Sequence, residues 1–329
     1  MNKFTSVIAN ILGGLIYVLS LLPMRVQYAF SDCIYAVLYY IIRYRRKIVR
    51  RNLQESFPEM DEATRLQTER KFYHWLCDYV VETFKLLSIG DEEMRRRMTF
   101  PDIEKVNKLI GEGKSVALFL GHYCNWEWVS TLPLWVTSPD CQCGELYHPL
   151  RNAVVDKIFL RLRQRFHTVC IPKKESIRQI IRYMRDGKSV VIGYIADQKP
   201  KWRDIHLWLP FLNHPETPVF TGSERIIEHT KQVPFYCEMS RPKRGYYVCE
   251  FKEMTLLAQP KTSSSGDKKA AGEGSTADFP LTRMYMKMLE ENIRRHPEYY
   301  LWSHDRWSRT REEFDRRYYV ENGKVYNRQ

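Results

Sequence analysis

The sequence predicts an α/β fold in which helices flank a mixed sheet, preceded by an amino-terminal membrane helix. From residue 115 onward, short apolar runs alternate with helical stretches of about a dozen residues, the pattern of an α/β sheet covered on both faces. An uncharged apolar segment occupies residues 4–24. The 329 residues are enough for one core and a membrane-contacting extension, so we expect a single globular domain.

The apolar segment at residues 4–24 is long enough to cross the hydrocarbon core of a bilayer as a helix. A secretory signal fits less well, because only Lys3 precedes the segment and no small-residue cleavage site follows it. A buried helix of a globular protein is the other alternative. The second apolar stretch, residues 29–42, contains Asp32 and is short for a membrane span.

Six basic residues follow in RYRRKIVRR, at residues 43–51. Such a cluster next to apolar sequence is attracted to anionic lipid and favours the cytoplasmic side of a membrane, although a solvated helix face has the same composition. We therefore expect a membrane anchor with a basic juxtamembrane segment over residues 1–52 and an α/β domain over 53–329.

Within that domain, hydrophobic periodicity predicts helical structure over residues 60–98. A flexible surface loop is expected at residues 259–277, which lack apolar content. Strands are expected at residues 115–120, 168–171, 189–193, 233–238 and 246–251, and further helices at 154–166, 175–186, 222–231 and 279–295.

Composition limits the partners. The 52 basic and 39 acidic side chains leave a net charge of +13, which favours nucleic acid, anionic lipid or an acidic carrier protein. No nucleic-acid-binding signature occurs and the charge is spread along the chain, so we expect no nucleic acid. The eight cysteines form no CxxC pair, which indicates a reducing compartment. Metalloprotease, nucleophile-elbow and P-loop motifs are absent from the sequence.

The main candidate for chemistry is the His122-x4-Glu127 pattern, which follows a predicted buried strand and Gly121. A neutral histidine is a suitable base near pH 7, and a carboxylate on its other ring nitrogen would orient it. The two can meet only if His122 lies in the turn and Glu127 in the first turn of a helix. The spacing alone arises by chance, so a structural histidine is the alternative. Cys124 could be a nucleophile, but its neighbours give no reason for a lowered pKa.

Five blocks, in order, resemble those of the late acyltransferases of lipid A biosynthesis, within the wider lysophospholipid acyltransferase-like superfamily. The resemblance covers the anchor and residues 100–311. The blocks are GHYCNWEW from Gly121, YHPLRNAVVDKIFLRLR from Tyr147, GYIADQKP from Gly193, LWLPFLNHPETPVFTG from Leu207 and PEYYLWSHDRW from Pro297.

This resemblance implies a glycerolipid acyltransferase-like fold with His122 as general base and Glu127 as its partner. The donor would be an acyl chain on the phosphopantetheine of acyl carrier protein, with no metal or other cofactor. The acceptor would be a hydroxyl of a lipid A precursor at the cytoplasmic face of the bacterial inner membrane. Substrate contacts are expected from Asn125, Arg151, Asp197, Gln198, His304 and Arg306, and Arg161, Arg163 and Arg165 are candidates for steering acidic partners.

Two departures from the family pattern concern the acceptor. His148 replaces the arginine of the YRP block, so Arg151 would take over its contact, and Asp305 interrupts the terminal basic pair. An O-acyltransferase acting on an amino-acid lipid or a glycerophospholipid therefore remains the alternative, with a non-enzymatic membrane-surface protein as a third. Asp197 could equally order a loop or support the histidine. We expect a monomer.

Overall fold

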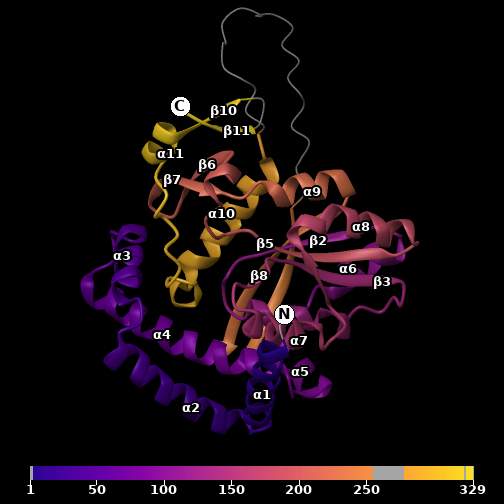
Figure 1. The fold of residues 1–329 in the computed structure, drawn as a ribbon, viewed down its shortest axis with the longest axis horizontal. Helices are drawn as coiled ribbons and strands as arrows, with labels where there is room; N and C mark the ends of the chain where they lie inside the picture. The colour runs from indigo at the N-terminus through magenta and orange to yellow at the C-terminus, as the bar shows by residue number, and fades with distance from the viewer. Residues whose placement is uncertain (1–2, 255–277, 322–323, 329) are drawn as a thin grey trace, which may run out of the picture.

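A seven-stranded sheet forms the centre of the computed structural model, which describes residues 3–254, 278–321 and 324–328 (Figure 1). The strand order is β1-β9-β8-β2-β5-β3-β4, and neighbours pair in parallel except β8 and β9, which are antiparallel. The predicted α/β fold with a mixed sheet is thereby confirmed. The strands are β1 (Met98–Thr99), β2 (Val116–Leu120), β3 (Cys141–Tyr147), β4 (Val169–Pro172), β5 (Ser189–Ile195), β8 (Val233–Lys243) and β9 (Tyr246–Glu253).

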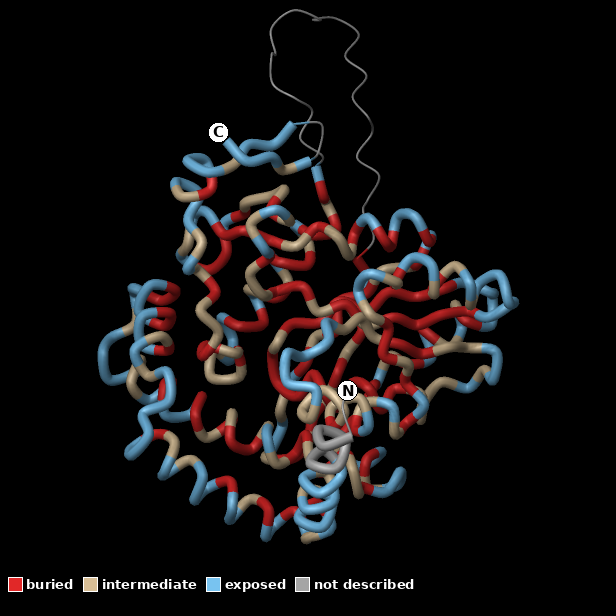
Figure 2. Tube along the Cα trace, viewed as in Figure 1, coloured by how far each residue is buried: buried red, intermediate tan, exposed pale blue. Residues whose placement is uncertain are grey.

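Helices cover both faces of this sheet, with α8, α9 and α10 on one side and α4 and α7 on the other (Figure 1). Every residue of β2 is buried, because a strand covered on both faces has no solvent side (Figure 2). The helices of the domain are α4 (Glu62–Lys85), α5 (Asp91–Arg97), α6 (Ile103–Gly111), α7 (Ala153–Gln164), α8 (Ser176–Arg185), α9 (Gly222–Thr230), α10 (Pro280–Arg295) and α11 (Arg311–Arg317).

Several elements differ from the sequence prediction. The helical region predicted over residues 60–98 is divided between α4 and α5, because buried Leu86 and Ile89 form a turn before Gly90. The predicted loop 259–277 lies outside the described residues. Short elements that periodicity does not reveal are η2 (Trp126–Leu134), η3 (Lys173–Glu175), η4 (Trp202–Asp204), η5 (Pro297–Tyr299) and the hairpins β6 (Leu207–Phe211)–β7 (His214–Val219) and β10 (Tyr318–Glu321)–β11 (Lys324–Asn327).

The amino-terminal region is a chain of short helices: α1 (Lys3–Ser20), α2 (Met24–Ala36), the π-helix η1 (Val37–Ile42) and α3 (Arg46–Ser56). The single membrane helix predicted over residues 4–24 is not confirmed, because α1 ends at Ser20 and a new helix begins after Pro23. None of the described helices is by itself long and apolar enough to span a bilayer. The pair Asn10–Ser20 and Met24–Ile42 passes that test together, but it is bent by 115°.

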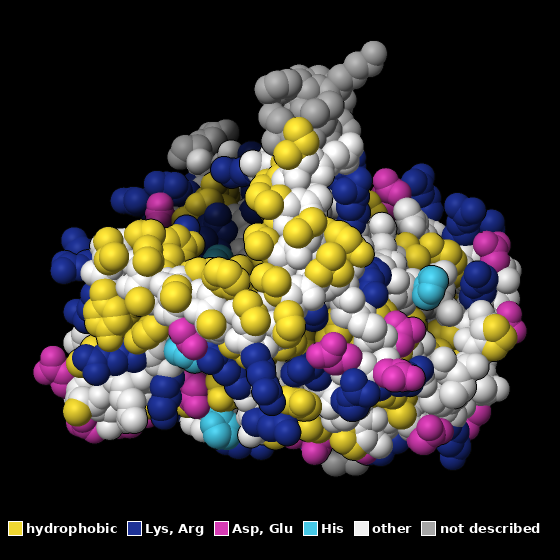
Figure 3. Space-filling view, turned by 90° about the horizontal axis from the view of Figure 1, so that it is seen from below, with side chains coloured by type: hydrophobic (Ala, Val, Ile, Leu, Met, Phe, Trp, Pro, Cys, Tyr) yellow, Lys and Arg dark blue, Asp and Glu magenta, His cyan; other side chains and the backbone are white. Residues whose placement is uncertain are grey.

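These helices expose a continuous set of large apolar side chains, which we call the amino-terminal apolar surface. Hydrophobic side chains gather along α1 and α2 when the molecule is viewed from below (Figure 3). Burying apolar area is favourable, so a surface of this extent in a folded protein marks an interaction site. It comprises Ile11, Leu15, Val18, Leu21, Phe30, Ile34, Tyr40, Ile41 and Ile42.

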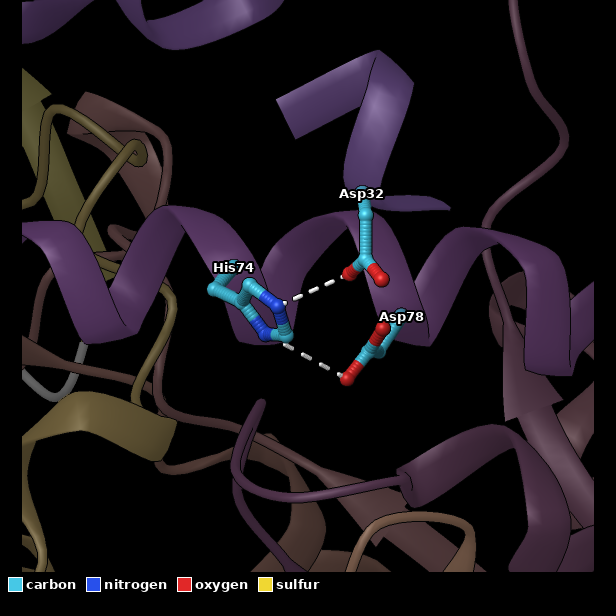
Figure 4. A group of neighbouring side chains, drawn as sticks. All are labelled: Asp32, His74 and Asp78. Atoms are coloured by element: carbon cyan, nitrogen blue, oxygen red, sulfur yellow. Dashed lines mark ion pairs between the residues drawn. The ribbon is translucent and has the colours of Figure 1, made fainter. Parts of the chain in front are cut away.

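A charged cluster fixes α2 to the sheet domain. Asp32 of α2 and His74 and Asp78 of α4 point toward one another (Figure 4), with 2.9 Å between His74 Nε2 and Asp32 Oδ1. Arg244, in the β8–β9 turn, lies 2.6 Å from a carboxylate oxygen of each aspartate. Among the described residues, Asp32, His74 and Asp78 have a spacing suited to a metal ion. The guanidinium of Arg244, however, already supplies positive charge to both carboxylates. The cluster therefore connects α2 to α4 and to the β8–β9 turn.

Candidate active site

Two parallel strands at the centre of the sheet, β2 and β5, position the residues of the candidate site. In the register of β2 and β5, Leu120 pairs with Ile195. His122 and Asp197 each lie two residues beyond these positions, so they leave the sheet side by side at its carboxyl edge. Loops and helix termini converge at this edge in α/β folds, and ligands bind there.

Asp197 holds His122 through two contacts. Asp197 Oδ1 lies 2.6 Å from His122 Nδ1, and the backbone N–H of His122 donates to Asp197 Oδ2 at 3.0 Å. The aspartate is 1% exposed. Burial by itself would raise the pKa of Asp197, but the charge and hydrogen bonds of His122 hold it below its usual value. An ionised carboxylate therefore fixes both the position and the orientation of the imidazole.

The second ring nitrogen of His122 is the one that faces away from Asp197. Gln198 Nε2 lies 3.1 Å from His122 Nε2, and Trp126 packs against the ring with 5.0 Å between centroids. With the proton on Nδ1 toward Asp197, Nε2 carries the lone pair and accepts from the Gln198 amide. The His122 side chain is 19% exposed, so this nitrogen belongs to a residue that is accessible in part to solvent.

The backbone around His122 is held by a segment distant in sequence. Leu301 N–H donates to the His122 carbonyl at 3.1 Å, and Cys124 N–H donates to the Tyr299 carbonyl at 2.9 Å. A Cβ at position 121 would lie 2.5 Å from a methyl carbon of Leu289 on α10, so a larger residue there would force this buried side chain to shift. The turn after β2 is therefore fixed from two sides.

The thiol of Cys124, considered above as a nucleophile, is completely buried. Burial raises its pKa well above the usual value, so the thiol stays protonated at neutral pH. Cys124 also has a φ of +52°, which is left-handed backbone at a non-glycine residue. A nucleophilic role is incompatible with this environment.

Glu127 does not contact His122 in the structure, which corrects the pairing expected from the sequence. Its two carboxylate oxygens accept from Arg163 at 2.6 and 2.7 Å, and the Tyr79 hydroxyl donates at 3.4 Å. Glu127 is the second residue of the 3₁₀-helix η2, and its side chain points between α4 and α7, where it is 2% exposed. The partner of His122 is Asp197, and a catalytic role of Glu127 stays a prediction.

Arg163 forms ion pairs with two carboxylates. Besides Glu127, it lies 3.2 Å from Glu145 at the end of β3. Burial raises the pKa of Glu145 to about 7, although Arg163 opposes this rise. We refer to Glu127, Glu145 and Arg163 as the Arg163 triad. The guanidinium was a candidate for steering acidic partners, but in the structure it is occupied by these two acids.

Asn125 is completely buried, and both ends of its side chain are engaged. Its Oδ1 accepts from Trp128 N–H at 3.2 Å, which caps η2, and its Nδ2 donates to Glu82 at 2.9 Å. The substrate contact expected from Asn125 is therefore replaced by a structural role.

The remaining predicted binding residues occupy different environments. Arg151 is exposed in the loop between β3 and α7, at the same edge of the sheet as His122. His304 is partly buried, accepts from Lys199 N–H at 3.4 Å, and has a pKa that burial lowers to about 4. Arg306 is 1% exposed and donates to the Pro218 carbonyl at 2.6 Å. Substrate contacts by Arg151, Gln198 and His304 stay predictions. The side chain of Arg306 is too deeply buried in this structure to contact a substrate.

A cavity of about 520 Å³ lies between the amino-terminal helices and the segment that carries His304. One wall belongs to α2, η1 and α4, and the other to residues 301–304, whose backbone contacts His122. A hollow rimmed by hydrophobic side chains is visible beside α1 in Figure 3. The cavity is lined by Ile34, Leu38, Tyr44, Arg45, Leu76, Cys77, Val80, Leu301, Ser303 and His304.

The sequence identified His122 as a candidate but pointed to Glu127, from the same motif, as its partner. The signal for Asp197 was its position, because it follows the end of a buried strand at the same distance as His122 does. That signal becomes specific only when β2 and β5 are known to be adjacent. Nothing in the sequence indicated that Arg163, more than thirty residues away, would claim Glu127.

The structure is an α/β sheet with a histidine–aspartate pair at the ends of two adjacent parallel strands, the edge at which α/β folds bind ligands. Residues 4–309 match the model of the bacterial lipid A biosynthesis acyltransferase family. The chain belongs to this family and is an acyltransferase.

Curated relatives agree, at low identity. The lipid A biosynthesis lauroyltransferase of Escherichia coli (strain K12) is 22% identical over 308 residues, which are 93% of this chain and 92% of that protein. A lipid A biosynthesis acyltransferase of Haemophilus influenzae is 20% identical over 251 residues, 76% of this chain and 72% of the relative. The lipid A biosynthesis acyltransferase 2 of Shigella flexneri is 21% identical, covering 79% and 77% respectively.

Proposed function

We propose that the protein transfers a fatty acyl chain from acyl carrier protein to a hydroxyl of a lipid A precursor, with His122 as general base and Asp197 as its orienting carboxylate. The observation that carries this proposal is the His122 ring itself. Its Nδ1 is fixed by Asp197, and its Nε2 lies 3.1 Å from the neutral amide of Gln198. Membership of the lipid A acyltransferase family supports the acceptor class.

In the proposed reaction, the acceptor hydroxyl takes the place of the Gln198 amide at His122 Nε2. The ring removes the hydroxyl proton as the oxygen attacks the thioester carbonyl. Collapse of the tetrahedral intermediate breaks the carbon–sulfur bond, and the imidazolium donates its proton to the leaving thiolate, which departs as the thiol of the carrier. Asp197 stabilises the imidazolium between these two steps, as the aspartate does in a Ser-His-Asp triad.

We infer that the amino-terminal apolar surface lies in the plane of the cytoplasmic leaflet of the inner membrane. Ile11, Leu15 and Val18 are 57–69% exposed, and Ile41 reaches 74%. The basic residues that follow η1 give this surface the charge that suits anionic lipid headgroups. The bend of 115° after Ser20 fits an orientation along the interface better than a straight crossing.

The cavity beside the site extends this proposal to the lipid chain. Apolar side chains of α2, η1 and α4 line one wall of the cavity, and Arg45 and His304 are its basic lining residues. The apolar wall suits a hydrocarbon chain, and His304 lies on the segment whose backbone contacts His122. This arrangement suits a substrate that is apolar along its length and polar at its reacting end.

Mass spectrometry of lipid A tests the proposed function. Wild-type protein and His122→Ala are expressed in a bacterial host that lacks its own late acyltransferase. We expect lipid A to gain the mass of one acyl chain with the wild type only, because alanine removes the base. Both proteins should sediment with the membrane fraction, which also tests the proposed location.

An equal mass gain with His122→Ala would contradict the role of His122. If neither protein modifies lipid A while both are membrane-bound, the acceptor is another lipid, such as an amino-acid lipid or a glycerophospholipid. Whole-lipid profiling of the same cells would then identify the lipid that gains a chain with the wild type alone.

A further inference from the structure

The cavity between the amino-terminal helices and residues 301–304 is lined by two basic side chains, Arg45 and His304, as well as by apolar ones. Nη1 of Arg45 donates to the Ser303 carbonyl at 2.9 Å, which places the guanidinium beside the segment that contacts the His122 backbone. In Figure 3, dark blue Lys or Arg side chains are visible inside the hollow, behind its hydrophobic rim. The cavity therefore combines an apolar wall with a cation that a neutral backbone group holds in place.

Arg45 differs from the arginines that follow it in its lack of an acidic partner. In helix α3, the arginines at positions 46, 50 and 51 each form an ion pair with an acidic side chain. Arg45 caps the start of that helix and is exposed, and among the described residues it pairs with no carboxylate. A guanidinium presents several donors in one plane, an arrangement that suits a carboxylate or a phosphate. The fold therefore leaves this cation available to an anion from outside the chain.

The backbone that presents Arg45 is strained. Arg43 and Arg45 have φ values of 55° and 52°, which is left-handed backbone that residues other than glycine rarely adopt. They follow the π-helix η1 directly, and both π-helical turns and strained backbone are frequent at functional sites. The Tyr73 hydroxyl on α4 donates to the Tyr44 carbonyl and holds the segment in this conformation. The result is that Tyr44 and Arg45 both line the cavity.

The charges around this part of the cavity favour an anion. Lys199, in the loop after β5, is half-buried. Burial lowers its pKa, and the positive charges of the arginines at positions 45, 306 and 309 lower it further, whereas Asp305 raises it. Asp305 is already paired with Arg51. Positive charge is therefore in excess here.

His304 supplies a neutral donor next to this positive charge. Burial lowers its pKa to about 4, so the ring is uncharged at neutral pH. Its Nε2 accepts from Lys199 N–H at 3.4 Å, which leaves the ring proton on Nδ1, where it can be donated. Lys199 follows Gln198, whose amide lies 3.1 Å from His122 Nε2. An anion bound by Arg45 and His304 would therefore lie close to the proposed base.

We propose that Arg45, with His304 beside it, binds the phosphate of the lipid acceptor. This proposal rests on the proposed function and deepens it, because it assigns the acceptor to the phosphorylated lipids. Ile34, which is 43% exposed, belongs both to the cavity and to the amino-terminal apolar surface, so the cavity is continuous with the surface that we assign to the membrane. The phosphopantetheine arm of the donor also carries a phosphate, but this continuity favours a ligand that arrives from the bilayer.

The test compares Arg45→Gln with Arg43→Gln. Both changes remove one positive charge from the same segment at a left-handed residue, but Arg45 lines the cavity and Arg43 is not among its lining residues. The acceptor is a lipid A precursor purified from a host without its late acyltransferase, before and after a phosphatase has removed its phosphate groups. We expect Arg45→Gln to raise the KM for the untreated acceptor about tenfold or more, the usual effect of losing a hydrogen bond between charged groups. The KM for the treated acceptor should not change, and Arg43→Gln should leave both constants close to their wild-type values.

The KM for acyl carrier protein distinguishes the two sources of phosphate. We expect it to be the same in Arg45→Gln and in the wild type. A rise in this constant alone would assign Arg45 to the donor and overturn the proposal. Equal increases of KM for treated and untreated acceptor, or an equal increase in Arg43→Gln, would overturn it as well. Arg45→Lys keeps the charge and should retain most of the preference for the untreated acceptor.

If Arg45→Gln does not fold, His304→Ala replaces it, because this change leaves the strained segment intact. It removes the second donor, so the preference for the untreated acceptor should fall by a smaller factor. An unchanged preference in this variant would contradict the proposal.

Binding without turnover separates this proposal from the proposed function. The full chain with His122→Ala, in detergent, is titrated with the treated and the untreated precursor. We expect the untreated lipid to bind about tenfold or more tightly, and the additional change Arg45→Gln to remove this difference. A difference that persists in the double variant would refute the phosphate site even if the wild type is active. Conversely, loss of the difference would support the site even if the wild type transfers no acyl chain.

Discussion

His122–Asp197 and Glu127–Arg163 are two charge pairs that each take one residue from the GHYCNWEW block, and they differ in their bonding. In both pairs a buried carboxylate meets a partner that is about one fifth exposed: His122 is 19% exposed and Arg163 is 20% exposed. Arg163 is occupied by two carboxylates, Glu127 and Glu145, whereas Nε2 of His122 lies beside the neutral amide of Gln198. A ring nitrogen beside a neutral amide can exchange a proton with a substrate, whereas a carboxylate bonded twice to one guanidinium holds helices together. The two residues of the block, five positions apart, therefore belong to a chemical pair and a structural pair.

The largest effect should come from removing the charge of Asp197. We expect Asp197→Asn to lower kcat by about a thousandfold or more, because the amide neither holds the same imidazole tautomer nor stabilises the imidazolium. Glu127→Gln, the same change in the other pair, should lower thermal stability more than Asp197→Asn does. Comparing kcat and melting temperature for the two variants measures this contrast. Equal losses of kcat at equal stability would assign Glu127 a direct part in the reaction.

Breaking the Arg163 triad at its centre should have the next largest effect. Arg163→Met leaves Glu127 and Glu145 without their common cation, and loss of one partner of a buried pair costs about 3–5 kcal/mol of stability. Urea unfolding of the solubilised protein provides the measurement. We expect Arg161→Met, on the same helix but exposed, to change the unfolding free energy far less. A stability loss of the same size in both variants would show that the triad adds nothing beyond an ordinary surface charge.

The smallest effect concerns the pH dependence of stability. Burial raises the pKa of Glu145 to about 7 from a usual 4.5, so the folded state binds its proton more tightly than the unfolded state does. The stabilisation from this proton is complete below about pH 4.5 and is lost as the pH rises through about 7. Glu145→Gln should remove this loss, so the gain in melting temperature over wild type should be larger at pH 8 than at pH 5. A difference that does not vary with pH would argue against a shifted pKa at Glu145.

The comparison also marks the limits of sequence reasoning at this site. His122 was identified because it follows a buried strand and a glycine, where ligands bind in α/β sheets, and the strand itself is visible as an uninterrupted apolar run. Its partner was misassigned because spacing along a chain says little about distance once a 3₁₀-helix turns the backbone after Asn125. Asn125 and Arg306 were both predicted to contact the substrate, but both are buried. The sequence could not show this, because a polar residue type is equally compatible with a functional contact and with buried structural bonding.

By itself, the sequence determined the α/β class, the alternation of strands and helices, the family blocks and the apolar amino terminus, since each depends on local composition and period. Only the tertiary structure decided that α1 ends before Pro23 and turns along a surface, that β2 and β5 are neighbours, and that Asp197 rather than Glu127 reaches His122. The physical reason is that a parallel register joins residues 75 positions apart, and no local pattern encodes which strands lie side by side.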